Sequence, residues 1–137
     1  MATTYSFREL KSKEVIETIT ATRSLDVGDS HKTFLIGTDA LVVTLPSTLL
    51  GLKYTFINSA ADGGAIITLS PAAADGINGT ITLAAAIVEL SGVVNKDLIN
   101  TKATATTGNS VTLIGTGVAG TTAWMVTGST GIWASQG

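Results

Sequence analysis

The chain contains no cysteine among its 137 residues, which excludes disulfide bonds, zinc–thiolate sites and cysteine nucleophiles. Charged residues are also few: they make up 13% of the sequence, about half of the usual share. The formal net charge is −2 and the isoelectric point is about 5.1. The sequence therefore lacks the basic excess expected of a nucleic-acid-binding protein or of a polybasic protein that binds membrane surfaces.

Groups of residues that could carry out catalysis are missing as well. The one histidine, His31, lies in a segment expected to be a loop, whereas a metal site or a general base needs partners. The segment 115–120 matches the dinucleotide pattern G-x-G-x-x-G, but a strand is expected after it, not the helix that holds the pyrophosphate. We predict that the protein is not an enzyme and uses no metal or other cofactor.

The sequence is rich in short β-branched and aromatic runs separated by Gly, Pro, Asn and Asp, which is typical of strands joined by tight turns. The runs predict strands at 17–23, 32–37, 41–45, 52–58, 65–70, 77–83, 110–114, 123–127 and 131–134. Segment 84–90 fits either a strand or a short helix, and we favour a strand. About eight to eleven such strands indicate an all-β protein, an antiparallel β-sandwich or a jelly-roll-like domain.

Charge is unevenly distributed along the chain. Ten of the eighteen charged residues lie between Arg8 and Lys32, and none follows Lys102. We therefore expect an N-terminal extended arm with the first strand in residues 1–30 and a β-sandwich domain in residues 31–137. Soluble monomers usually keep charges on their whole surface. We expect neighbouring chains to cover the C-terminal third, with Trp124, Ile132 and Trp133 at an oligomer interface; a neutral Thr/Ser/Gly surface is the alternative.

Several short motifs resemble a pattern found in tailed-bacteriophage structural proteins. They are Val43-Thr-Leu-Pro46, Gly51-Leu-Lys-Tyr-Thr-Phe-Ile-Asn58, Ile67-Thr-Leu-Ser-Pro71, Asp75-Gly-Ile-Asn-Gly79, Gly108-Asn-Ser-Val-Thr-Leu-Ile114 and the segment from Trp124 to Trp133. The similarity extends over roughly residues 41–134. Modules of this kind occur in head decoration (cement) proteins, head fibres and tail fibres.

The module forms nearly the whole chain after a short charged arm, so the resemblance is greatest to a capsid decoration protein. It implies a homotrimer on the outer surface of a phage head, made in the host cytoplasm, that binds the major capsid protein and stabilises contacts between its subunits, with no nucleic-acid or membrane partner. The implied capsid contacts are the charged residues of the arm: Arg8, Glu9, Lys11, Lys13 and Glu14. The alternative is a tail-fibre or receptor-binding tip that binds carbohydrate through Trp124 or Trp133.

Overall fold

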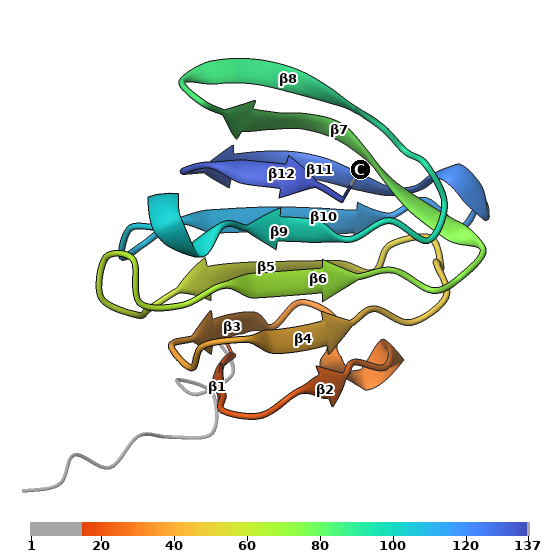
Figure 1. The fold of residues 1–137 in the computed structure, drawn as a ribbon. Coiled ribbons are helices and arrows are strands. Elements are labelled where there is room, and N and C mark those ends of the chain that lie inside the picture. The colour runs from red at the N-terminus through yellow and green to blue at the C-terminus, as the bar shows by residue number, and fades with distance from the viewer. Residues whose placement is uncertain (1–14, 137) are drawn as a thin grey trace, which may run out of the picture.

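The computed structural model describes residues 15–136, which form two mixed β-sheets (Figure 1). The strands are β1 (Ile16–Ile19), β2 (Arg23–Ser24), β3 (Thr33–Ile36), β4 (Leu41–Thr44), β5 (Lys53–Asn58), β6 (Ile67–Ser70), β7 (Asp75–Leu83), β8 (Ala86–Ser91), β9 (Leu98–Asn100), β10 (Ser110–Gly115), β11 (Gly120–Thr130) and β12 (Trp133–Ser135). Two 3-10 helices of three residues each, η1 (Val27–Asp29) and η2 (Lys102–Thr104), lie between strands. The expected all-β class is confirmed.

The first half of the chain winds as a flattened coil between the two sheets. The larger sheet has the order β1-β3-β5-β10-β11-β7-β8, and the smaller sheet has the order β12-β9-β6-β4-β2. Each early turn of the chain adds one strand to each sheet, and successive turns stack in parallel, as β1–β3–β5 and β2–β4–β6. In the second half of the chain the added strands pair mostly antiparallel, as in β10–β11 and β12–β9.

This parallel stacking corrects the expected antiparallel architecture. Among the residues described, β1–β3, β3–β5, β2–β4, β4–β6 and β7–β11 are all parallel pairs. Alternation of apolar and polar residues has the same period of two in parallel and antiparallel strands, so the pattern could not separate them. Between two parallel strands of one sheet, the chain crosses to the other sheet and forms a strand there. This crossing takes the place of the helix that often connects parallel strands.

Most of the expected strands are present; β9 was not expected, and three of the expected segments differ locally. The strand expected at 17–23 is broken into β1 and β2, one in each sheet, so the first strands belong to the same two sheets as the rest of the described chain. The ambiguous segment 84–90 begins with a turn at Ala84 and Ala85 and then forms β8. Strand β11 begins three residues earlier than expected and runs to Thr130.

The core lies between the two sheets, and strands β4, β5, β6 and β10 contribute alternate residues to it. In β5, for example, Tyr54, Phe56 and Asn58 are buried, while the residues between them are only partly covered. The Phe34 and Phe56 rings stack with centroids 5.6 Å apart, and the Tyr54 and Trp124 rings lie 5.7 Å apart. Burying each of these large side chains contributes about 2–3 kcal/mol to folding.

The larger sheet is two strands wider than the smaller one. Starting from β1 and β2, the two strand orders match pair by pair until β11 and β12. Strands β7 and β8 have no counterpart in this order: β12, the last strand of the smaller sheet, contacts β7, and that sheet has no further strand beyond it, at the top of Figure 1. We call this projecting hairpin, residues 75–91, the overhang.

Candidate functional site

Four charged side chains form a closed cluster where the chain enters the larger sheet. Arg23 is paired with Glu17 and, through Nη2, with Oδ1 of Asp29 at 2.8 Å. The Nζ atom of Lys32 lies 2.9 Å from the same Asp29 oxygen and 3.2 Å from Oε2 of Glu17. The Arg23 guanidinium also lies over the Phe34 ring, 5.6 Å from its centroid. Two positive and two negative groups therefore neutralise one another.

The cluster shifts the acidity of its own members. Burial raises the pKa of Asp29, but hydrogen bonds from Lys32 and from the Asp26 backbone, with the charge of Arg23, outweigh it, and the pKa lies below its ordinary value. Hydrogen bonds from Arg23 and Lys32 likewise lower the pKa of Glu17. Because each charge is already paired inside the chain, the cluster anchors η1 to the sheet and offers little to a partner.

A second surface consists of exposed apolar side chains on η1 and on the loops that precede β5 and β11. Val27, Leu49, Leu50 and Val118 are all more than half exposed, and Leu50 reaches 85%. The loops around Leu50 and Val118 are held together by a hydrogen bond from the Gly51 N–H to the Gly115 carbonyl, at 3.2 Å. We call these four residues the apolar loop end.

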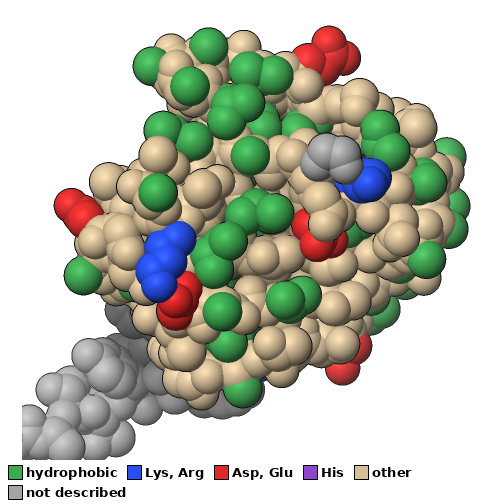
Figure 2. Space-filling view, viewed as in Figure 1, with side chains coloured by type: hydrophobic (Ala, Val, Ile, Leu, Met, Phe, Trp, Pro, Cys, Tyr) green, Lys and Arg blue, Asp and Glu red, His purple; other side chains and the backbone are tan. Residues whose placement is uncertain are grey.

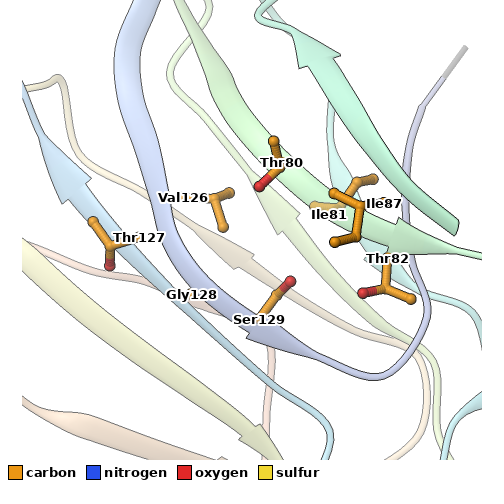
Figure 3. Close-up of a pocket in the computed structure, with 8 residues that line it drawn as sticks. All are labelled: Thr80, Ile81, Thr82, Ile87, Val126, Thr127, Gly128 and Ser129. Carbon is orange, nitrogen blue, oxygen red and sulfur yellow. The ribbon is translucent and has the colours of Figure 1, made fainter.

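The third surface is the overhang and the cleft at its base (Figure 3). Strands β7 and β11 pair only as far as Asn78 and Met125, and beyond that point they separate. The cleft between them has a free volume of about 150 Å³. Its lining includes Thr80, Thr82 and Ser129 together with Ile81, Ile87 and Val126. Thr80 and Ser129 point into the space between the two strands (Figure 3). The lining carries hydroxyl and apolar groups but no ionisable side chain, so it fits binding better than catalysis.

The two tryptophans are core residues, which corrects their expected place at an oligomer interface. Trp124 and Trp133 are 0% exposed in a single chain, so neither has surface left for a neighbouring copy. Trp133 donates its Nε1–H to the Thr130 carbonyl at 3.0 Å. Tryptophan brings a large apolar area to cores and interfaces alike, and sequence position could not distinguish the two. Ile132 is half-buried, and its contact with another chain stays a prediction.

The expected capsid contacts Arg8, Glu9, Lys11, Lys13 and Glu14 lie outside the described residues. His31 is exposed in the loop after η1, with a positive φ of 68°. The glycine-rich segment 115–120 leads into strand β11, so no helix N-terminus follows it. Within residues 15–136, no group of three His, Asp or Glu side chains is placed to hold a metal ion.

The sequence did not reveal the overhang as a surface. Apolar residues alternate along both strands of the hairpin, at Ile81 and Leu83 and then at Ala86 and Val88. The two-residue turn at Ala84 and Ala85 interrupts this pattern, so it can be recognised only when the position of the turn is known. In the same described part of the chain, no helix is long and apolar enough to span a membrane. No model of a known protein family matches this chain, and no curated protein sequence matches it.

Proposed function

We propose that this protein is a structural virion protein that decorates the outside of a phage head and stabilises contacts between major capsid subunits. The observation that supports it most is the amount of apolar side-chain surface left exposed on a two-sheet body. Leu50, Ile87 and Val118 are 85%, 79% and 61% exposed. A free monomer would be expected to carry charges at such places. The sequence motifs of phage structural proteins point to the same class.

The proposed role is mechanical. A decoration protein ties neighbouring capsid subunits together against the outward pressure of packaged DNA. The chain would act as a homotrimer, because three linked copies multiply weak contacts through effective concentration. The charged arm would lie on the capsid and pair with its charges. The described body joins the arm at β1, which is an edge strand of the larger sheet.

A tail-fibre or receptor-binding tip is the second candidate, and the cleft at the base of the overhang favours it. Hydroxyl groups of Thr80, Thr82 and Ser129 line this cleft beside apolar side chains, a mixture that suits a sugar. Burial of both tryptophans removes the aromatic platform on which this alternative relied.

Immunogold electron microscopy with an antibody against this chain, on particles of the virus that encodes it, tests the proposal. Label spread over the head is the expected result. Label confined to the tail tip would overturn the decoration role and would favour the receptor-binding alternative, which a glycan array with the purified chain would then examine. Particles of a deletion mutant that lacks this chain are the control for antibody specificity.

A further inference from the structure

The overhang is an amphipathic hairpin. Ile81 pairs with Val88, and Leu83 pairs with Ala86, so these four side chains share one face with Leu90. The opposite face carries mostly polar residues, namely Asn78, Thr80, Thr82, Ile87, Glu89 and Ser91. The apolar face is the one that continues the core, since Ile81 and Leu90 belong to the core cluster.

Only part of this apolar face is covered. Ile81 and Leu90 are 2% and 3% exposed, whereas Leu83 and Val88 are 39% and 36% exposed. The difference agrees with the strand order, because the smaller sheet ends at β12, which contacts β7, and it has no further strand that could cover β8 and the hairpin tip. The core therefore continues outward into an open apolar surface.

The free edge of β8 also lacks the usual protection. Among the described residues β8 pairs only with β7, so its other edge presents unpaired backbone groups. Natural edge strands are commonly shielded by lysine, proline or a bulge, and β8 has none of these. Glu89 is the only charged residue between Gly76 and Ser91. Figure 2 shows hydrophobic side chains scattered over this upper part of the molecule with a single acidic group beside them.

We propose that the overhang is the surface through which copies of this chain associate, with the apolar faces of neighbouring overhangs packed together about a common symmetry axis. The partner at this face is a second copy of the chain. Its overhang presents the same two-stranded face, apolar and uncharged, and two such faces can pack against each other. On this face of the hairpin, Leu83 and Val88 are partly exposed, and the small side chain of Ala86 lies exposed beside Leu83.

Residues 1–14 of the same chain are the other segment that could cover this apolar face, and their charges argue against it. Five of the first fourteen residues are charged, and an apolar face would have to desolvate them. A second copy brings only apolar groups to the same place. The inference deepens the proposed function, and the number of three copies rests on that function. Association through the overhang itself can be measured on the purified chain, without any capsid.

Native mass spectrometry and light scattering of the full chain, at about 10 µM, test the inference. We expect an oligomer for the native chain. In the double variant Leu83→Glu with Val88→Glu, charges would meet at the contact, and we expect association to weaken on the order of 100-fold or more. The matched control is Leu50→Glu with Val118→Glu, which places the same charges on the apolar loop end and should keep the native mass.

Cross-linking gives a readout that does not depend on disrupting the contact. The chain has no cysteine, so Ala86→Cys introduces a single thiol on the apolar face of the overhang. Mild oxidation should join two copies of this variant, whereas Leu50→Cys should remain a single chain. Circular dichroism verifies that every variant is folded.

A monomeric native chain would overturn the inference, as would a folded L83E/V88E variant that keeps the native mass. An oligomer that dissociates when residues 1–14 are removed, but not in L83E/V88E, would assign the contact to the arm and would also overturn it. A dimer in place of a trimer would leave the overhang contact standing and contradict only the copy number. Tail-tip immunogold label would reject decoration without affecting the mass, so the two proposals fail separately.

Discussion

Three buried asparagines connect the ends of the two sheets at one side of the core. Asn58 donates from Nδ2 to Oδ1 of Asn100 at 2.7 Å, and Asn100 donates from its own Nδ2 to the Ile132 carbonyl at 3.0 Å. Asn109 accepts the Thr106 N–H at 2.9 Å. All three side chains belong to the buried polar residues. Buried amides of this kind stabilise a fold only when their partners are complete.

Replacing Asn100 with alanine should therefore lower the free energy of unfolding by about 2–3 kcal/mol, because the Ile132 carbonyl loses its donor and the Asn58 amide loses an acceptor. Urea unfolding monitored by circular dichroism measures this. Asn95→Gly is the control, since Asn95 is exposed with a φ of 58° that glycine adopts freely. An Asn100→Ala midpoint equal to that of the native chain would show that the network contributes nothing.

The buried carboxylate of Asp29 makes stability depend on acid pH. Its pKa is lowered in the folded chain relative to the ordinary value of 3.8, so the unfolded state takes up protons first as the pH falls. The stabilisation is complete above the unfolded pKa and is lost as the pH drops through the folded pKa. We expect unfolding free energy to decrease on acidification below about pH 4.

Asp29→Asn should weaken this acid dependence and cost about 1–3 kcal/mol at pH 7, since Arg23 and Lys32 each lose a charged partner. The measurement is thermal unfolding between pH 2 and pH 7. The exposed Asp62, replaced by Asn in the same way, is the control. An Asp29→Asn variant whose stability falls with acid as steeply as that of the native chain would place the titrating groups elsewhere.

At the scale of elements, the overhang turn is built from an unusual pair. Ala84 and Ala85 have φ values of 48° and 67°, the sign required at both central positions of a type I′ hairpin turn. Alanine is strained in this region, whereas Asn-Gly adopts it readily. This is why segment 84–90 could not be divided from the sequence: no turn residue marks the break.

The double variant Ala84→Asn with Ala85→Gly should stabilise the chain by about 0.5–1.5 kcal/mol, because the preferred turn residues relieve the strain. Differential scanning calorimetry at one protein concentration measures the rise in melting temperature. Ala73→Gly, an exposed alanine without a positive φ, is the control and should be neutral or slightly destabilising. A lower melting temperature for the turn variant would show that the tip conformation is fixed by other contacts.

Strand positions were largely predictable, and strand partners were not. Inward residues such as Tyr54 and Phe56 alternate with outward ones, and that local pattern is enough to locate β5. Parallel stacking of β1, β3 and β5 depends on where the chain returns after crossing to the other sheet, which no local pattern encodes. For the same reason, the sequence placed Trp124 and Trp133 at an interface: burial by an opposite sheet is a property of the whole fold.

At the scale of the whole molecule, the described chain begins at one edge of the larger sheet and the overhang lies at the opposite edge. The chain enters the larger sheet at β1, and β8 is the last strand at the other side. With six spacings of about 4.8 Å between seven strands, the two edges are roughly 29 Å apart. Contacts between copies and contacts with a capsid can therefore form independently on the proposed decoration protein.

This separation makes the role of the arm testable by deletion. The cut belongs after residue 14, because the Thr33 N–H donates to the Val15 carbonyl at 3.0 Å and holds the start of β1. We expect the truncated chain to keep its melting temperature and oligomeric mass, while binding to capsid shells that lack the native protein falls at least about 100-fold. Co-sedimentation with such shells measures binding.

The control for this deletion is the full chain with Arg8, Lys11 and Lys13 changed to glutamine, which keeps the length of the arm and removes its positive charge. If charge pairing dominates, this variant should bind as weakly as the truncated chain, and binding of the native chain should fall with added salt. Normal decoration by the truncated chain would mean that the body alone attaches to the shell. The apolar loop end, exposed at Leu49 and Leu50, would then be the surface to mutate.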